Sequence, residues 1–468
     1  MTRGAQLLIH DVQIDRDRRV DVTLRDGRIA SIQPRTDRHP GQDGVDGRGG
    51  WLIPGLHDHH IHLAAAAAAL TSVICGPPEV SSATDLRLAL RRAAVGVPPG
   101  AWIRGVAYHE SVAGKLDRFA IDRWESQHPV RIQDRSGALW MLNSAAVRLL
   151  QLAADRDPGV ERTADRVPTG RLWRADHLLQ GRAPDVPDTT AIARRLLSLG
   201  VTGVTDATPD IDDTGLALLE RAARAGLQVC SLGLPGAQPR SPVAAGPRKI
   251  IIDDPLQLTI TDLVDDISRT HRMHRGVAIH CVSLDSLLLA LTALEEAGVD
   301  PADRLEHVAW AGPAELRRLR DLGVRVVTQP SFIADRGDSY LQMVSVGPEH
   351  DGWLYRYGSL LSRGIPVASS SDAPYGEIDP WRVLRCARDR RAASGRTIGA
   401  RERVEVPVTL SGYLSSALAP GGPARRIAEG EDAHLCLLHV PREEVIRSPD
   451  SALVRLTVAR GQVVAGAV

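Results

Sequence analysis

The sequence has little lysine, little phenylalanine and no long apolar run. Its 57 basic residues include only two lysines, Lys115 and Lys249, and only two phenylalanines are present, so Val, Leu, Ile and Ala must form most of the core. The longest apolar run, Leu63 to Leu70, is too short to cross a bilayer. The first residues lack the apolar segment of a secretory signal. We therefore expect a soluble, cytoplasmic protein.

Neither sign of charge prevails, and cysteines are few. Lys plus Arg equals Asp plus Glu, 57 against 57, which gives no general attraction to nucleic acid or to an anionic membrane. The five cysteines are scattered and lack Cys-x-x-Cys spacing, which argues against a disulfide framework or a zinc ribbon. We expect a small-molecule substrate, neither nucleic acid nor membrane as a partner, and we allow for a homodimer.

One short stretch concentrates metal-binding residue types. Four histidines and an aspartate follow a Pro-Gly break within six residues. In an extended strand, side chains alternate between faces, so Asp58, His60 and His62 share one side. His57 and His59 face the other side, and we interpret both as structural. Two imidazoles two residues apart can hold one metal ion, whereas the simpler alternative is a polar strand end.

Both ends of the chain show short strands of alternating polarity. Asp26-Gly27 and Arg460-Gly461 are typical of tight turns between such strands. Neither end has enough apolar length to fold alone, so we expect both to pair into one small β-sandwich. The predicted strands are Gln6 to Gln13, Val20 to Leu24, Arg28 to Ile32, Ala433 to His439, Leu453 to Ala459 and Gln462 to Val464.

Eight further strand candidates lie between these ends. From the second onward, most alternate with amphipathic, helix-like stretches such as Leu284 to Ala297 and Pro313 to Leu322. Eight parallel strands with intervening helices form a (β/α)8 TIM barrel, so the predicted class is α/β. The eight candidates are Leu56 to His62, Val201 to Asp206, Gln228 to Leu234, Lys249 to Asp253, Val277 to Val282, Arg304 to Ala309, Val324 to Gln329 and Pro366 to Ser371.

The gap between the first two barrel strands is too long for a structureless loop. We predict a barrel over 54–404, the β-sandwich over 1–53 and 405–468, and an inserted subdomain at about 77–190 that caps the first strand's end of the barrel. Within the whole gap between the two strands we expect helices at Ala83 to Ala94 and Ile192 to Leu199, strands at Trp102 to Tyr108 and Val130 to Asp134, and Pro- and Arg-rich loops from Asp155 to Pro187.

Several metal-binding residue types lie at the ends of the predicted barrel strands. The carboxyl ends of such strands point into one pocket, where barrel enzymes place their chemistry. Imidazoles with a carboxylate suit zinc or a similar divalent ion, and six donors are too many for one tetrahedral ion. The candidate ligands are His60, His62, Lys249, His280, His307 and Asp372.

Lys249 stands where this arginine-rich chain would ordinarily place arginine. It precedes three isoleucines, and burial there disfavours its charged form, so that the neutral amine can react with carbon dioxide to give a carbamate. The two carbamate oxygens could bridge two metal ions, which a guanidinium cannot do. The alternative is a lysine paired with an acid such as Asp253 or Asp254.

Taken together, these residues resemble the amidohydrolase superfamily, and within it the family 3 branch of N-substituted formamide deformylase-like metal-dependent hydrolases. Pro-Gly-x-x-Asp-x-His-x-His at the first strand, Arg-x-Glu-His at Arg304 to His307 and Ser-Asp-Ala-Pro at Ser371 to Pro374 carry the resemblance. Supporting matches are Gly200 to Asp206, Asn143 to Ala146 and Thr457 to Gly461.

The resemblance implies two divalent metals, most simply Zn²⁺, with His60 and His62 on one, His280 and His307 on the other and a carbamate on Lys249 as the bridge. It implies hydrolysis of a non-peptide C–N bond, in an amide, formamide or cyclic amide, by a hydroxide that the metals share. Asp372 would act as the proton shuttle between the attacking water and the leaving nitrogen.

Three departures from the family pattern fall on predicted pocket loops and leave the substrate open. Ser136-Gly137 is followed by Ala138 where the family often has His, the fourth strand runs into Asp253-Asp254-Pro255, and Cys281-Val282 follows His280. His109 could replace the missing imidazole, with a surface histidine as the alternative. Trp140 and Tyr375 could line the apolar part of a substrate, and structural packing is the other reading of Trp140.

Other functions remain open at this point. A lactonase or a phosphotriesterase-like hydrolase would use the same metal set on a C–O or P–O bond. A catalytically silent barrel scaffold would be expected to lose ligands, and none of the six is missing. A serine amidase is disfavoured because no Gly-x-Ser-x-Gly elbow occurs and neither lysine has serine three residues before it.

Overall fold

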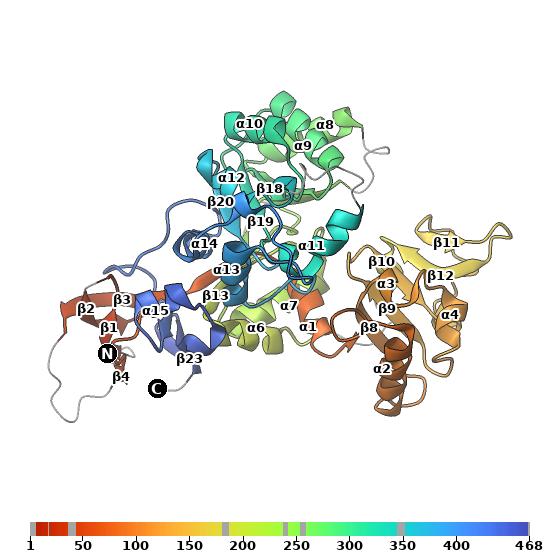
Figure 1. The fold of residues 1–468 in the computed structure, drawn as a ribbon, viewed down its shortest axis with the longest axis horizontal. Helices are drawn as coiled ribbons and strands as arrows, with labels where there is room; N and C mark the ends of the chain where they lie inside the picture. Colours follow the sequence, from red (N-terminus) through yellow and green to blue (C-terminus); the bar gives the residue numbers. More distant parts are fainter. Residues whose placement is uncertain are drawn as a thin grey trace. The chain divides into compact units, whose positions relative to one another are not determined.

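The computed structural model describes residues 6–16, 18–35, 44–179, 187–236, 242–252, 259–343 and 352–466. Asp253 and Asp254, the acids considered as partners of Lys249, lie outside these residues. The chain divides into two compact units, a larger one of Met1–Ala64 with Thr189–Val468 and a smaller one of Ala65–Asp188 (Figure 1). Among the described residues, every helix is too short or too polar to pass through a bilayer.

Parallel strands form the centre of the larger unit, in two sheets. One sheet has the order β15-β14-β13-β6 and the other β16-β17-β18-β19-β20. Backbone hydrogen bonds continue between them, from Lys249 N to Leu232 O at 3.0 Å and from Asp372 N to His60 O at 2.8 Å. The strands are β6 (Leu56–Ile61), β13 (Val201–Asp206), β14 (Gln228–Ser231), β15 (Val243–Ala245), β16 (Arg248–Ile251), β17 (Val277–Cys281), β18 (Arg304–His307), β19 (Arg325–Thr328) and β20 (Val367–Ser369).

These strands confirm the predicted α/β class, and their closed order is consistent with a TIM barrel. Each of the eight predicted barrel strands is present, most of them shorter than predicted. The short β15 is an addition that the sequence did not indicate, because Val243–Ala245 carries no period that separates it from a loop.

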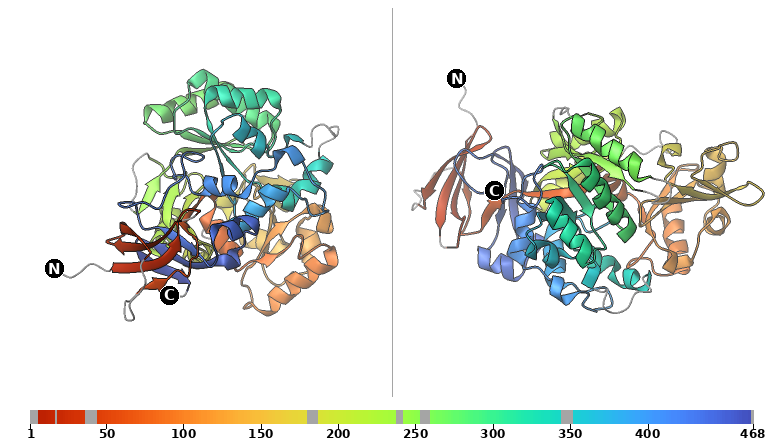
Figure 2. Two further views of the ribbon diagram at one scale, coloured as in Figure 1. Left: turned by 60° about the vertical axis from the view of Figure 1, so that its left-hand side comes forward. Right: turned by 90° about the horizontal axis from the view of Figure 1, so that it is seen from above.

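Helices follow most of these strands along the chain and pack on their outer side (Figure 2). In α9, buried Leu287, Leu291 and Leu294 recur at the helical spacing, and Ser283 caps the first turn. The helices of the larger unit are α6 (Thr189–Ser198), α7 (Asp213–Arg224), α8 (Ile260–Arg272), α9 (Leu284–Ala297), α10 (Pro313–Leu322), α11 (Phe332–Met343), α12 (Tyr357–Ser362), α13 (Pro380–Asp389), α14 (Val406–Tyr413) and α15 (Arg442–Arg447).

The two ends of the chain meet in a sandwich of two sheets, as predicted (Figure 1). One sheet has the order β3-β2-β1-β4 and the other β23-β22-β21-β5. Ile9, Val22 and Leu52 from the N-terminal part pack in one apolar core with Leu437 and Val458 from the C-terminal part. The strands are β1 (Gln6–Gln13), β2 (Arg19–Arg25), β3 (Arg28–Pro34), β4 (Val45–Asp46), β5 (Leu52–Pro54), β21 (Leu435–Leu438), β22 (Val454–Ala459) and β23 (Gln462–Gly466).

The smaller unit is built on a six-stranded sheet of the order β11-β12-β10-β9-β8-β7. The expectation of loops from Asp155 to Pro187 is wrong for part of that range, because β11 and β12 lie within it. The apolar pattern of a strand is interrupted by Arg171, because this charged residue is buried and pairs with Glu161 at 3.2 Å. The elements are β7 (Val73–Ile74), β8 (Ile103–Tyr108), β9 (Val130–Asp134), β10 (Leu139–Leu142), β11 (Val160–Arg162), β12 (Pro168–Trp173), α2 (Ala83–Val95), α3 (Glu110–Ala113), α4 (Arg118–Asp122) and α5 (Ser144–Leu149), with α1 (Leu63–Ala69) at the boundary between the units.

Candidate metal centre

The histidines of β6 separate onto its two faces as the alternation predicts. His57 Nε2 lies 2.9 Å from Thr205 Oγ1, and His59 Nε2 lies 3.1 Å from the Gly412 carbonyl oxygen. Both imidazoles therefore make structural contacts with neighbouring elements. His60, on the other face, and His62, directly after the strand, turn towards Asp372, which follows β20.

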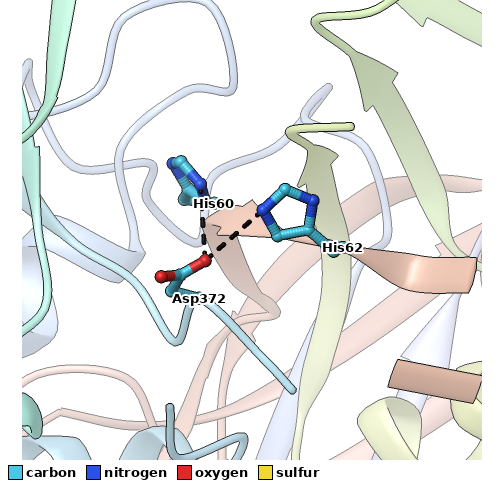
Figure 3. Close-up of side chains that lie close together, drawn as sticks. All are labelled: His60, His62 and Asp372. Atoms are coloured by element: carbon cyan, nitrogen blue, oxygen red, sulfur yellow. Dashed lines mark ion pairs between the residues drawn. The ribbon is translucent and has the colours of Figure 1, made fainter. Parts of the chain in front are cut away.

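His60, His62 and Asp372 bring three ligand atoms together (Figure 3). The Nε2 atoms of both imidazoles lie 3.5 Å from Asp372 Oδ1, and the three ligand atoms lie within 4.8 Å of one another. Metal bonds of about 2.1 Å in a tetrahedral site place neighbouring ligand atoms roughly 3.4 Å apart. Asp372 Oδ1 is buried, and none of the described residues donates a hydrogen bond to it. A divalent cation fits this donor set and would satisfy the buried oxygen.

A buried carboxylate fixes the orientation of His60. Glu306 Oε2 accepts a short hydrogen bond from His60 Nδ1, which leaves Nε2 as the metal-binding nitrogen. Arg304 holds that carboxylate through Nε at 2.6 Å from Oε1, and its Nη2 donates to the His59 carbonyl at 3.0 Å. Sequence reasoning used Arg304 and Glu306 only as parts of a motif. Their role in orienting His60 depends on β18 lying across from β6. The spacing of residues in the sequence does not predict that arrangement.

The other predicted ligands lie next to this group. Lys249 Nζ is 3.5 Å from His60 Nε2, and the His307 ring lies 4.9 Å from that of His60 and 4.6 Å from that of His280, between centroids. His307 Nδ1 donates to Gln329 Oε1 at 2.8 Å, so that Nε2 is its free metal-binding nitrogen. The structure therefore brings all six predicted ligands together. Gln329 was not foreseen as a partner of His307, because it follows a different strand, β19.

Burial controls the charges at this centre. It raises the pKa of Asp372 to about 7, and the nearby charge of Lys249 acts against that rise. Burial also lowers the pKa of Lys249, and it lowers the pKa of His62 and of His307 to about 3. The imidazoles are therefore neutral near pH 7, which is the form that binds a metal ion.

The backbone is strained at two of the strand ends that carry ligands. His307, Val308 and Asp372 have φ values of 69°, 47° and 54°. Non-glycine residues rarely adopt this region, and for β-branched valine it is especially unfavourable. Val308 is nevertheless buried in the core. Such strain persists where surrounding contacts impose it, which is typical of functional sites.

The three residues predicted to contact substrate have different surroundings. The Tyr375 ring lies 5.4 Å from that of His62, between centroids, so Tyr375 is at the centre. Trp140 is buried in the core of the smaller unit and donates from Nε1 to Asp176 at 2.7 Å, which is a packing role. His109 caps α3 and accepts from Ser111 N at 3.3 Å. Contact of His109 or Trp140 with a substrate stays a prediction.

Known proteins resemble this chain over almost its whole length. It is 25% identical to N-substituted formamide deformylase from Arthrobacter pascens over an aligned length of 496 residues, gaps included. The alignment covers 89% of each chain. Two solved structures of uncharacterized metal-dependent hydrolases share the fold. That from Pyrococcus horikoshii OT3 has 18% identity and a TM-score of 0.73 and covers 98% of this chain and 100% of its own. That from Pyrococcus furiosus has 19% identity and a TM-score of 0.70 and covers 93% and 99%.

The family assignment follows from a match that spans the centre and part of the terminal sandwich. Residues 43–465 match the amidohydrolase family. The matched range contains His60, His62 and Asp372, and it runs from β4 to β23. This chain therefore belongs to the amidohydrolase family.

Proposed function

We propose that this protein hydrolyses a non-peptide C–N bond of a small molecule, in an amide, formamide or cyclic amide, at a metal centre on the rim of a (β/α)8 barrel. The observation that carries the proposal is the convergence of His60 Nε2 and His62 Nε2 on the buried Oδ1 of Asp372, at 3.5 Å each. The family and the resemblance to a formamide deformylase support the choice of bond.

Asp372 has the properties that the proton transfers need. Hydrolysis forms a C–O bond from water and breaks the C–N bond, and one water proton must reach the leaving nitrogen. Burial raises the pKa of Asp372 to about 7, so its carboxyl group can accept a proton near neutral pH and release it again. A bound divalent cation would polarise the substrate carbonyl and lower the pKa of the attacking water.

We propose that the other half of the centre binds a second ion, and that the metal is zinc, which imidazoles favour. Lys249 is buried, its pKa is lowered, and its Nζ lies 3.5 Å from His60 Nε2. A neutral amine in this position can form a carbamate, whose two oxygens would reach towards both pairs of histidines. In this proposal His280 and His307 would hold the second ion, and a carbamate on Lys249 would supply oxygen ligands to both ions.

A substrate panel tests the bond type. Metal-loaded protein is offered N-formyl amines, N-acyl amines, cyclic imides, lactones and a phosphotriester, and product formation is followed for each. We expect turnover of at least one C–N class, abolished by removal of the metal and restored by Zn²⁺. Cleavage of lactones or of the phosphotriester alone would reject the proposal, and no turnover by fully metal-loaded protein would favour a silent scaffold.

A further inference from the structure

Helix α11 places the guanidinium group of Arg336 at the edge of the metal centre. Arg336 lies on α11, and its Nη2 donates a short hydrogen bond to the Tyr375 carbonyl oxygen. Tyr375 comes three residues after Asp372, and its ring lies 5.4 Å from that of His62. The Arg336 side chain is only partly buried. A guanidinium is thus fixed directly beside the residues proposed to bind and cleave the substrate.

The surroundings keep this guanidinium charged and in place. Its Cζ lies 4.3 Å from the centroid of the Phe332 ring, one turn earlier on α11, and Tyr340 one turn later hydrogen-bonds to it. The adjacent acid Asp335 instead pairs with Arg382 at 2.9 Å. Arg336 and Asp372 are close enough to perturb each other's ionisation. The charge of Arg336 therefore acts on the metal centre itself.

Aromatic side chains accompany this charge. Partly buried Tyr340 and Tyr375, together with Trp310, pack against the apolar cluster that contains Phe332 and Tyr355. Their part-exposed rings offer apolar surface next to a fixed cation. A ligand that matches both features has an apolar group beside an anionic one.

We propose that Arg336 binds a carboxylate of the substrate, which makes the substrate class an N-acylated or N-formylated amino acid with an apolar side chain. The inference rests on the proposed function, since it assigns the substrate of the same centre. The planar guanidinium can donate hydrogen bonds to a carboxylate, and it would hold the scissile amide next to His62 and Asp372. The purely structural alternative is that Arg336 only fastens α11 to the segment after β20.

Matched substrates that differ only in charge separate these roles. N-formylphenylalanine is compared with N-formylphenylalaninamide, using metal-loaded wild-type protein, Arg336→Gln and Arg318→Gln. The last variant removes the same charge from α10, where Arg318 pairs with Glu295 at 2.7 Å. A charge-assisted pair contributes about 1.5–3 kcal/mol, so we expect wild type to prefer the acid by roughly 10- to 100-fold in kcat/KM. That ratio should fall to about 1 in Arg336→Gln, mainly through KM, and stay unchanged in Arg318→Gln.

Calorimetric binding of both compounds to metal-loaded protein keeps the test independent of turnover. If neither compound is cleaved, tighter binding of the acid to wild type than to Arg336→Gln still supports the inference, although the proposed function then needs other substrates. Equal binding of acid and amide to wild type overturns the inference even if both are cleaved. An unchanged preference in folded Arg336→Gln also overturns it, and Arg336→Met, which likewise removes the charge, provides the same readout should the glutamine variant fail to fold.

Discussion

Asp372 meets several demands at once. It is buried, its backbone has a φ of 54°, and its Oδ1 faces the Nε2 atoms of His60 and His62. Asparagine is a matched replacement, because it has the same shape and tolerates this backbone region. We expect Asp372→Asn to keep its metal and to lose turnover by about 10²- to 10⁴-fold, since the amide cannot shuttle a proton. Metal analysis alongside kinetics checks this, and loss of metal would instead make Asp372 mainly a ligand.

The two lysines of this chain offer a matched pair of substitutions. Lys249 is buried beside His60, whereas Lys115 has a side chain that is 64% exposed and lies 3.5 Å from Glu161. Arginine is the other long basic side chain and can be placed at either position, but its guanidinium cannot form a carbamate. We expect Lys249→Arg to abolish activity and lower the metal content, and Lys115→Arg to change neither. Elemental analysis of protein purified without chelator measures the metal, and near-normal turnover of Lys249→Arg would contradict the bridging role.

Sequence spacing could predict the residues at the centre but not the contacts between them. His60 and His62 were recognisable from their spacing on one strand, and His307 because it ends a short apolar stretch. All strand ends of a parallel barrel meet at one rim. The carboxylate of Glu306 on His60 and the amide of Gln329 on His307 connect different strands. Such contacts depend on which strands face each other and on side-chain rotamers, neither of which leaves a periodic signal in the sequence.

At the scale of elements, β13 shapes the structural face of β6. The strands are parallel, with Gly203 opposite His57, and the His57 ring lies so close that a Cβ at Gly203 would be 2.4 Å from Nδ1. The repeated glycines of Gly200 to Asp206 were visible as a motif, but the need for Gly203 appears only when β6 is placed beside it. Strand order could be predicted from the alternation of strands and helices, whereas β11 and β12 could not, because buried Arg171 breaks the apolar pattern.

This packing predicts the effect of one added methyl group. Gly203→Ala should lower the free energy of unfolding by about 1–3 kcal/mol, because the methyl group overpacks the contact with His57. Metal content should stay as in wild type, since His60 faces the other side of β6. Gly352→Ala is the control, as nothing lies within 4 Å of a Cβ there. Urea unfolding measures the stability of both variants. Equal stability of the two would show that β6 and β13 can move apart to make room for the methyl group.

At the scale of the whole molecule, buried titratable groups couple stability to pH in two opposite ways. Burial lowers the pKa of six imidazoles. The unfolded chain binds protons on these groups below about pH 6.5, whereas the folded chain keeps them neutral there. Burial raises the pKa of three carboxyl groups to about 6 or 7, so these hold protons that the unfolded chain releases. The imidazoles are those of His57, His59, His60, His62, His307 and His434, and the carboxyl groups are those of Asp58, Asp206 and Asp372.

The imidazoles outnumber the carboxyl groups, and this decides whether stability rises or falls as the pH decreases. Near pH 5.5 the unfolded chain binds more protons at these groups than the folded chain, so stability falls as the pH decreases there. We expect the urea midpoint of metal-free protein to drop steadily from pH 7.5 to pH 5.5. Asp372→Asn removes one of the protons held by the folded state, and its midpoint should therefore fall more steeply than that of wild type. A midpoint that rises on acidification would mean that the buried carboxyl groups, and not the imidazoles, dominate the proton balance of the fold.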